Sequence, residues 1–535
     1  MLKKIIVGVS ILFFSNLVLA QTAPFNIEIA SFQIEELGGL QSFSFGQANG
    51  KWLLVGGRLD GLHRRQPWAS FDVAGHNNQL IVVDPVAEKK WVTSLSTLPI
   101  SVQEQLSSTN MNFFQEGDYL YCIGGYGFSN TQNDHITFPY LTEISVSNVI
   151  DAIVNNTSIT PYFRQITDSQ FQVTGGRLKK INDVFYLMGG HKFMGRYNPM
   201  NNPTFSQEYT NQIRRFTIVS SEDNLEVNHL TPFVSANDFH RRDYNAEPQI
   251  LPNGKEGLTM FSGVFQPTID LPYLNSVTID SSTYTVNNTF QQYYNHYHCA
   301  VVPLYSEKRN EMHTVFFGGI AQYYDSSGVL VQDDNVPFVK TIARVTRDAN
   351  NSLAEYKLPI EMPALLGAGS EFIVDKSISH YHNEVLKLDE IQGDKILIGY
   401  IFGGINSQET NIFWTNDGTQ SIANNQIFKV YLTNNNPLSV HSLNQQSIGS
   451  LKLLVYQNPN NQFFTIKYNL KDTKNIKLTV FDLKGTILES SLLRDQKLGE
   501  NTLTRNINNM NKVGVYFINI ETPYESATQK IIVSK

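Results

Sequence analysis

The sequence predicts an all-β chain in which a six-bladed β-propeller is followed by a small C-terminal β-sandwich. Two observations carry this prediction. An apolar strand that closes on a Gly pair recurs along most of the chain, with further strands and polar turns around each copy. No amphipathic helical run of consequence interrupts these strands. The aromatic content of 12% also favours β-structure.

The repeated strand has five complete copies and one degenerate copy. A Gly pair at a strand end permits positive φ where the chain leaves the sheet, and it lets neighbouring backbones approach closely. In the degenerate copy, Ser262 stands in place of the first Gly. The six copies are Trp52–Gly57, Leu120–Gly125, Phe185–Gly190, Leu258–Gly263, Thr314–Gly319 and Gly399–Gly404. Such regularity indicates a structural repeat rather than a chance set of turns.

Further strands flank each copy. An inner strand precedes it, as in Asn245–Leu251 and Tyr297–Leu304, and outer strands follow it, as in Gln79–Asp84. Four antiparallel strands in each of six units predict a propeller, with a seven-bladed ring or an array of sandwiches as alternatives. Either Asn26–Phe32 or Leu438–Leu443 supplies the outer strand of the last blade.

The N-terminus has the pattern of a secretory signal peptide. Lys3 and Lys4 form a positive segment, Ile5–Leu19 is mostly apolar, and the small residue Ala20 ends a cleavage site. The apolar run is shorter than the ~20 residues that cross a bilayer. We therefore expect residues 1–20 to be removed, and we expect no transmembrane segment in the mature chain.

The stretch 451–535 has the pattern of a separate, Ig-like β-sandwich. Short alternating strands such as Leu478–Phe481 and Val515–Ile520 are separated by turn formers such as Gly485 and Gly514. A polar linker at 445–450 precedes this stretch. These residues therefore predict a small second domain.

Four motifs of this stretch resemble the type A C-terminal sorting domain of the type IX secretion system. They are Asn458–Asn460 ahead of Phe463–Ile466, Leu478–Gly485, Gly514–Ile520 and Lys530–Lys535. The resemblance implies that the secretion machinery recognises 451–535 and then removes it. It also implies a protein that is secreted, or held at the outer-membrane surface, in a Gram-negative bacterium. Such domains accompany enzymes, adhesins and binding proteins alike, so the resemblance says nothing about activity.

The repeat between the two ends is similar to that of kelch propellers. Its copies lie farther apart than the ~50 residues of a plain kelch unit, so each blade must carry insertions. We therefore expect a kelch-like propeller over 21–444, a linker at 445–450 and the sorting domain at 451–535.

Charge and cysteine content narrow the function classes. The chain has 41 Lys and Arg against 48 Asp and Glu, a formal net charge of -7, and no basic stripe, so nucleic acid is not an expected partner. Its two cysteines, Cys122 and Cys299, fall on different predicted blades, far beyond the ~7 Å between Cα atoms that a disulfide allows. We expect free, buried thiols.

The insertions concentrate after the Gly pairs, which places them on one face of the predicted ring. Long ordered loops cost closure entropy and add nothing to the core, so their coincidence favours a functional face over surface drift. The loops are Arg58–Asn78, Tyr126–Tyr140, His191–Asn211, Ile320–Phe338 and Ile405–Asn424.

Charged and aromatic residues gather in and beside these loops. Guanidinium groups suit carboxylate or sulfate groups, and Tyr or Trp68 suits the faces of sugar rings. The ligand-binding candidates are Arg58, Asp60, His63, Arg64, Arg65, Arg241, Arg242, Asp243 and Tyr244. They predict an acidic glycan or peptide ligand, whereas the alternative is a network of Arg–Asp pairs that joins the loops.

Four histidines are weaker candidates for a metal site. His296 and His298 would face the same side of a strand, and His380 and His382 have the same spacing. The segment Tyr297-His298 resembles a stretch of the copper-radical oxidases built on kelch propellers. Those enzymes need a Tyr–Cys crosslink, and no inner-strand Cys partner is found. Structural histidines that line the ring are the alternative, and no cofactor is predicted.

Motifs of common hydrolases and of phosphate-binding loops do not occur in the sequence. The leading hypothesis is a binding module for glycan or protein. The alternative is a propeller enzyme acting on sugars, mutarotase-like or copper-radical-oxidase-like. Its inner-strand candidates are Arg241, Arg242, Glu247, His298 and Glu371. A ligand site predicts that such charges converge on one open pocket, whereas a structural network predicts that they are paired and scattered.

Overall fold

A computed structural model describes residues 24–66, 68–198, 204–221, 224–326, 328–434, 451–457, 463–471, 475–482, 486–506, 514–522 and 526–533. The chain divides into two compact units, Met1–Asn435 and Asn436–Lys535. Strands dominate both units, so the prediction of an all-β chain is confirmed. The predicted signal peptide and the linker at 445–450 lie outside the described residues.

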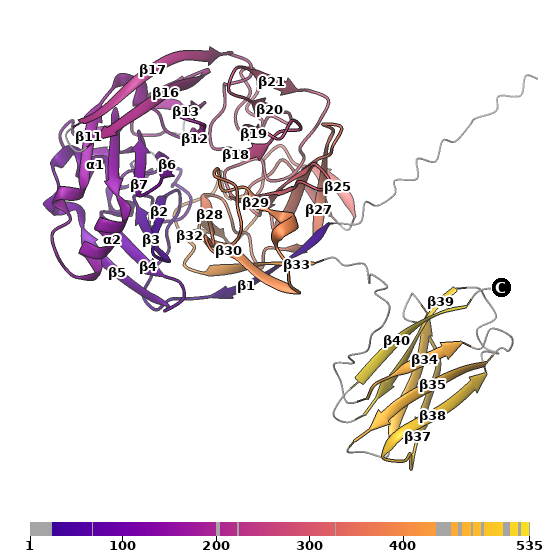
Figure 1. The fold of residues 1–535 in the computed structure, drawn as a ribbon. Coiled ribbons are helices and arrows are strands. Elements are labelled where there is room, and N and C mark those ends of the chain that lie inside the picture. Colours follow the sequence, from indigo (N-terminus) through magenta and orange to yellow (C-terminus); the bar gives the residue numbers. More distant parts are fainter. Residues whose placement is uncertain are drawn as a thin grey trace, which may run out of the picture. The chain divides into compact units, whose positions relative to one another are not determined.

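Six antiparallel sheets follow one another along the first unit (Figure 1). From the inner to the outer strand, the first two are β2 (Ser44–Ala48), β3 (Lys51–Val55), β4 (Gln79–Asp84), β5 (Lys89–Ser94), and β6 (Asn112–Glu116), β7 (Tyr119–Ile123), β10 (Tyr140–Ser145), β11 (Phe163–Thr167). The next two are β12 (Arg177–Ile181), β13 (Val184–Met188), β16 (Gln212–Ser221), β17 (Asn224–Val234), and β18 (Asn245–Ile250), β19 (Glu256–Phe261), β20 (Ser276–Ile279), β21 (Tyr284–Asn287). The last two are β22 (Ala300–Ser306), β23 (Glu311–Phe317), β26 (Thr341–Arg347), β27 (Leu353–Glu361), and β28 (Ser370–Val374), β30 (Lys395–Gly403), β33 (Ile427–Asn434), β1 (Phe25–Phe32).

A closed cycle of backbone hydrogen bonds joins the inner strands of all six sheets at their N-terminal ends. Each donor N–H comes from a residue at or just before an inner strand, and each acceptor C=O comes from the equivalent residue of the preceding sheet. The six residues are Ser42, Asn110, Gly175, Asp243, His298 and Gly369, with N–O distances between 2.8 Å and 3.3 Å. The last step returns to the start, because the Ser42 N–H donates to the Gly369 carbonyl at 2.8 Å. This backbone cycle surrounds the axis of the unit.

The N-terminal strand supplies the outer strand of the sixth sheet. β1 pairs antiparallel with β33 over its whole length, from Phe25 opposite Asn434 to Phe32 opposite Ile427. Of the two predicted closing strands, Asn26–Phe32 therefore takes this place, and Leu438–Leu443 lies outside the described residues. Phe25 and Ile27 are buried in a core shared by the fifth and sixth sheets.

Every Gly pair adopts the left-handed backbone conformation that the sequence predicts. The pair Gly124 and Gly125 has φ of 67° and 92°, and the other pairs are similar. Ser262, which replaces a Gly, takes the same conformation, with φ 54°. Space is also short, since a Cβ at Gly124 would lie 1.9 Å from the Val173 carbonyl oxygen. Glycine is therefore required by backbone and packing together.

The long loops have secondary structure of their own. Hairpins from the second and third loops join into one sheet, β8 (Tyr126–Ser129), β9 (Asp134–Thr137), β14 (His191–Gly195) and β15 (Phe205–Tyr209). The fifth and sixth loops form two further hairpins, β24 (Tyr323–Ser326) with β25 (Val329–Gln332), and β31 (Ile405–Ser407) with β32 (Ser421–Ala423). These loops are thus built elements of the face that carries the candidate residues.

Helices are few and short. They are α1 (Ile100–Leu106), α2 (Val146–Val154), η1 (Val73–Gly75), η2 (Leu95–Thr97), η3 (Thr160–Tyr162), η4 (Ser169–Phe171) and η5 (Leu388–Glu390), while β29 (Leu386–Lys387) adds a short parallel strand beside β22. α1 and α2 bury their apolar sides against the first two sheets, around Leu53, Leu80 and Leu120. Among the described residues, none of the helices has the length and apolar character needed to span a membrane.

The second unit has two sheets around one core. One sheet contains β34 (Leu454–Gln457), β35 (Phe463–Leu470) and β38 (Gly499–Asn506), and the other β37 (Ile487–Leu493), β36 (Ile476–Asp482), β39 (Gly514–Glu521) and β40 (Ser526–Val533). Phe464, Ile466, Leu478 and Ile518 are buried between them. The strands predicted around Leu478 and Val515 are therefore present. The motifs at 458–460 and 483–485 lie outside the described residues.

Both cysteines are free and buried, as the sequence predicts. Cys122 lies in β7 of the second sheet, and Cys299 directly precedes β22 of the fifth. Burial raises the pKa of each thiol to about 12. Both side chains therefore act as small apolar groups of the core.

Candidate functional site

Arg242 lies two residues before β18 and one residue outside the backbone cycle. Its backbone pairs with Val264, so the residue that follows the fourth Gly-type pair fixes its position. Its side chain is 17% exposed. Among the described residues, its polar contacts are Nη1 with His191 Nδ1 at 3.4 Å and Nε with Asp243 Oδ2 at 3.5 Å. The guanidinium is thus partly accessible and only loosely paired.

Aromatic side chains from several loops surround this guanidinium. It lies 5.3 Å from the ring centre of Phe265 and 5.9 Å from that of Tyr209. Tyr197 and Tyr297 lie close enough for the Arg242 charge to act on the pKa of both phenols. We call the group Arg242, Tyr197, Tyr209, Phe265 and Tyr297 the arginine cup.

The cup has unused hydrogen-bonding groups. Within the part of the chain that the structure describes, the hydroxyls of Tyr197 and Tyr297 make no side-chain hydrogen bond. Burial raises the pKa of both phenols, although the Arg242 charge opposes the shift, so both stay protonated at neutral pH. Burial lowers the pKa of Arg242, but the nearby tyrosines and Asp243 outweigh it and the net shift is upward. The cup therefore combines one fixed positive charge with neutral hydroxyl donors.

Histidines pack beside the cup in their neutral form. His63 stacks on Phe71 at 5.1 Å and meets the edge of Tyr197 at 4.8 Å. Burial lowers the pKa of His63 to about 4, and burial with the nearby Arg242 charge places that of His191 well below its ordinary value. His191 Nδ1 accepts from Gln207 Nε2 at 2.7 Å, so its Nδ1 carries no proton.

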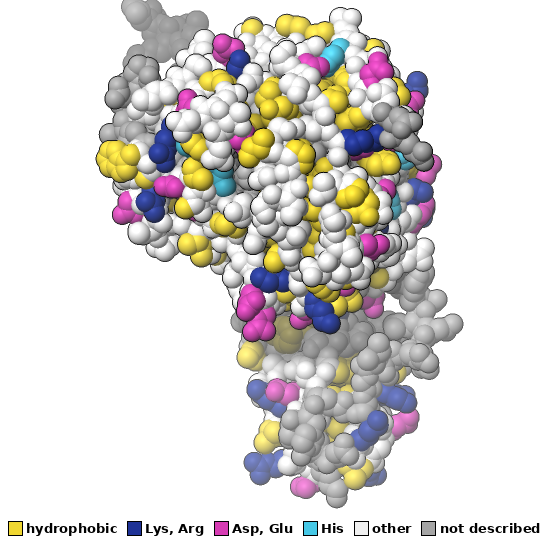
Figure 2. All heavy atoms as spheres, turned by 90° about the vertical axis from the view of Figure 1, so that its left-hand side faces the viewer, with side chains coloured by type: hydrophobic (Ala, Val, Ile, Leu, Met, Phe, Trp, Pro, Cys, Tyr) yellow, Lys and Arg dark blue, Asp and Glu magenta, His cyan; other side chains and the backbone are white. Residues whose placement is uncertain are grey.

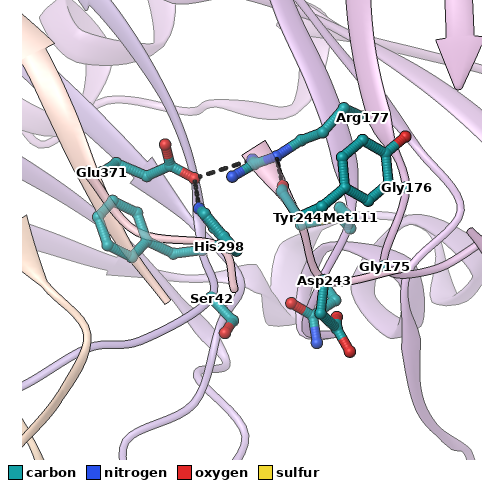
Figure 3. Close-up of a pocket in the computed structure, with 11 residues that line it drawn as sticks. Ser42, Met111, Gly175, Gly176, Arg177, Asp243, Tyr244, His298 and Glu371 are labelled. Carbon is teal, nitrogen blue, oxygen red and sulfur yellow. Dashed lines mark hydrogen bonds and ion pairs between the residues drawn. The ribbon is translucent and has the colours of Figure 1, made fainter. Parts of the chain in front are cut away.

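A charged cluster lies at the level of the backbone cycle (Figure 3). Glu371 and Arg177 point toward one another, with Glu371 Oε1 3.3 Å from Arg177 Nη1 and 2.8 Å from His298 Nε2. Arg177 Nε also donates to the Tyr244 carbonyl at 3.1 Å. These residues line a small pocket of about 290 Å³, open solvent included. All six inner strands contribute to its lining, through Ser42, Asn110, Gly175, Asp243, His298 and Glu371.

The charges of this cluster stabilise one another. Burial alone would raise the pKa of Glu371, but the neighbouring His298 and Arg177 outweigh it and hold that pKa at about 2. Burial and the Arg177 charge lower the pKa of His298, so His298 is neutral at pH 7 and Arg177 is the lasting counter-charge of Glu371. Asp243 differs, because burial raises its pKa. A firmly ionised Glu371 suits the role of a fixed charge better than that of a proton donor.

The structure separates the nine predicted ligand residues into three groups. Arg242, Asp243 and His63 lie in or beside the cup and pocket. Arg58 is 1% exposed and makes a bidentate pair with Asp60, at 2.7 Å and 2.5 Å, which matches the predicted network of loop-joining pairs. Arg64 and Arg65 belong to the contact between the first and the sixth loop, where Arg65 Nη1 donates to the Trp414 carbonyl at 2.6 Å.

Arg241 and Tyr244 are buried and hold the framework. Arg241 is 0% exposed, lies 3.9 Å from the Tyr273 ring centre, and donates to the carbonyls of Asp238 and Ser262 at 2.6 Å and 2.8 Å. Tyr244 is also 0% exposed, and its hydroxyl donates to the Met188 carbonyl at 2.7 Å. We leave both out of the proposed site because no ligand reaches their side chains.

The four candidate metal ligands do not come together. His296 is 0% exposed, and its two ring nitrogens contact the Gln292 carbonyl at 2.8 Å and the Gln322 N–H at 3.0 Å. His380 lies beside Leu386, which pairs with Leu304, six residues beyond His298; the distance along the strand is about 20 Å. His382 lies in the turn next to His380 rather than in a strand. No group of three or more potential metal ligands occurs among the described residues.

Two further predicted charges have other roles. Glu247 pairs with Lys179 at 3.0 Å between β18 and β12, deeper along the inner strands. Arg177 was not singled out from the sequence, although it follows Gly175-Gly176 at the start of β12, where the sixth sheet has Glu371. Aligning the first residues of the inner strands would have indicated it. Tyr197 and Tyr209 carry no comparable signal in the sequence.

Comparison with known proteins identifies the second unit. Residues 454–534 match the family model described as secretion system C-terminal sorting domain. No curated protein matches the chain. A solved structure described as "Structure of YjhT" is similar to this chain with 11% identity and a TM-score of 0.40, over 74% of this chain and 98% of that one.

The sorting domain expected from the sequence is therefore confirmed. This chain carries a C-terminal sorting domain of the type IX secretion system, and that domain implies an interaction with the type IX machinery. The chain is a secreted or cell-surface protein.

Proposed function

We propose that the first unit is a six-bladed, kelch-like β-propeller that binds an anionic ligand in the arginine cup. The closed backbone cycle, the six four-stranded sheets and the Gly pairs support the propeller assignment. We further propose a signal peptide at 1–20, the propeller over 21–444, a linker at 445–450, and an Ig-like sandwich over 451–535. The protein is then a binding module exported by the type IX system.

The observation that carries the binding proposal is the loosely paired Arg242 within three tyrosines. Buried or half-buried arginines usually bind a carboxylate closely, as Arg58 does with Asp60. Arg242 instead has its nearest carboxylate oxygen at 3.5 Å. A carboxylate or sulfate group of a ligand would supply the missing bidentate partner, and the free hydroxyls of Tyr197 and Tyr297 suit the hydroxyls of a sugar. An acidic glycan fits this set better than a neutral one.

A second candidate function rests on the cluster beneath the cup. Arg177, His298 and Glu371 are the only charged or titratable side chains besides Asp243 that line the described pocket, and a sugar-converting enzyme of the mutarotase type would use such groups in the channel. The firmly ionised Glu371 favours binding over proton transfer. A copper-radical oxidase would need the candidate histidines to converge, and those of the described chain do not.

Arg242→Ala tests the binding proposal. The purified protein is screened on a glycan array that includes uronate and sulfated glycans, and each hit is measured by calorimetry with the variant. Loss of one charge-assisted, bidentate contact costs about 1.5–3 kcal/mol, or roughly a tenfold or greater loss of affinity. The matched control is Arg309→Ala, an exposed arginine paired with Glu311 at a hairpin turn. Equal affinity of wild type and Arg242→Ala would refute the cup as the binding site.

A further inference from the structure

The first and the sixth loop are bound to each other beside the cup. The Leu62 N–H donates to Ser421 Oγ at 2.9 Å, and Asn416 Nδ2 donates to the Leu62 carbonyl at 2.7 Å. The Arg65 N–H donates to the Asn416 carbonyl at 3.1 Å, and Asp60 forms a β-bridge with Ile422. These bonds hold two segments from opposite ends of the unit as one surface.

This joined surface exposes large apolar side chains, which we call the loop platform. Its members are Leu59 (49%), Trp68 (75%), Val73 (50%), Trp414 (62%) and Ile422 (58%). Two of the four tryptophans of the chain are among them. Single exposed apolar residues need no explanation, but several on adjoining segments mark an interaction site. Elsewhere, on the face that Figure 2 shows, acidic and basic side chains are interspersed without forming a large patch of one sign.

The loop platform carries a positive charge that is not neutralised. The Arg65 guanidinium lies 4.7 Å from the Trp414 ring centre, and its Nη1 donates to the Trp414 carbonyl. Its Nε is buried and has no hydrogen-bond partner in the described chain. Neither Arg64 nor Arg65 forms an ion pair with a described carboxylate, whereas Arg58 is paired with Asp60. A cation on an exposed indole suits an anionic group attached to a ring that stacks.

The platform is continuous with the arginine cup through His63. Asn416 Nδ2 donates to the His63 carbonyl at 3.0 Å, and the His63 ring meets the Tyr197 ring of the cup at 4.8 Å. Arg65 follows two residues later. A chain molecule with one unit in the cup therefore passes His63 and reaches Arg65 and Trp414 without leaving the protein surface.

We propose that the ligand is an acidic polysaccharide rather than a single acidic sugar, with one residue in the cup and a second anionic residue on Arg65 and Trp414. This inference rests on the proposed function of the cup. Two weakly paired guanidinium groups, each beside aromatic rings and joined by a continuous surface, match a polymer with a repeated negative charge. A protein ligand would instead be expected to cover the aliphatic members of the platform.

The experiment compares ligand lengths. Binding of a monosaccharide and an octasaccharide is measured by calorimetry, with galacturonate as the carboxylated series, heparin fragments as the sulfated series and maltose oligomers as the neutral series. Wild type is expected to bind one acidic octasaccharide at least tenfold more tightly than its shortest fragment. Trp414→Ala and Arg65→Gln should each weaken octasaccharide binding about tenfold and leave the shortest fragment unchanged.

Tyr119→Ala is the matched control, because Tyr119 is 40% exposed at the start of β7, the end of that strand opposite its Gly pair. Circular dichroism checks that each variant is folded, and Arg65→Gln keeps the test valid if Trp414→Ala is not. Equal losses for short and long ligands, or no loss at all, overturn the platform subsite while leaving the cup intact. An unchanged Arg242→Ala variant overturns the cup itself. No binding by wild type in either acidic series overturns both, and binding of the neutral series alone does the same.

Discussion

Arg241 and Arg242 are adjacent in the sequence, yet the structure predicts opposite effects of their removal. Arg241→Ala deletes two charge-assisted hydrogen bonds to the carbonyls of Asp238 and Ser262, a third to Asn275 Oδ1 at 2.6 Å, and the contact with Tyr273. Each acceptor that is left unsatisfied in a buried site costs about 1–3 kcal/mol, and the vacated volume adds to this. We expect a loss of about 3–5 kcal/mol in the unfolding free energy of the first unit.

Urea unfolding followed by tryptophan fluorescence measures this loss for the first unit alone, because all four tryptophans lie in it. Arg242→Ala is the control, and it should stay within about 1 kcal/mol of wild type because the contacts of Arg242 are long. Arg241→Lys keeps the charge but not the planar fork, so it should fall between the two. If Arg241→Ala unfolds at the same urea concentration as Arg242→Ala, the buried network around Arg241 contributes nothing and the reasoning fails.

Three other predictions concern stability and reactivity. Gly124→Ala should cost more than about 3 kcal/mol, measured by the same unfolding assay, because its Cβ meets the Val173 carbonyl and its φ is positive. Burial raises the pKa of Glu355 to about 8, so the folded state favours the protonated acid; stability should fall as pH rises from about 4.3 to 8, and Glu355→Gln should flatten that fall. Cys122 and Cys299 should react with a thiol reagent in urea but not in buffer, which absorbance of the released chromophore reports.

The strands and the sorting domain could be predicted because each depends on local pattern. An apolar strand before a Gly pair needs only its own residues to specify a strand end, and the same holds for the sorting motifs. The degenerate copy shows the limit of the pattern, since Ser262 adopts the glycine conformation with the help of a hydrogen bond from its hydroxyl to the Tyr273 carbonyl at 2.6 Å. No local rule separates this serine from a turn residue.

The candidate site depended on contacts between distant segments, and there the sequence was less informative. Side chains that alternate along an extended segment point in opposite directions, so of two adjacent arginines one enters the core and the other the cup. Which one does so is decided by Ser262 and Asn275, which accept from Arg241. Tyr197 and Tyr209 come from a loop whose path is fixed by pairing between Met194 and Ile136 of another loop.

The pairing of β1 with β33 has a consequence for the order in which the protein is completed. Phe25 is among the first described residues, yet its partner Asn434 is the last of the first unit. During synthesis and export the N-terminal strand stays without its neighbour until nearly the whole unit has emerged, and the closure entropy of so long a loop makes this the slowest contact to form. Until then its alternating apolar face remains available to other strands. The final strand pair thus acts as a check on completeness, because a chain truncated before β33 cannot bury its own beginning.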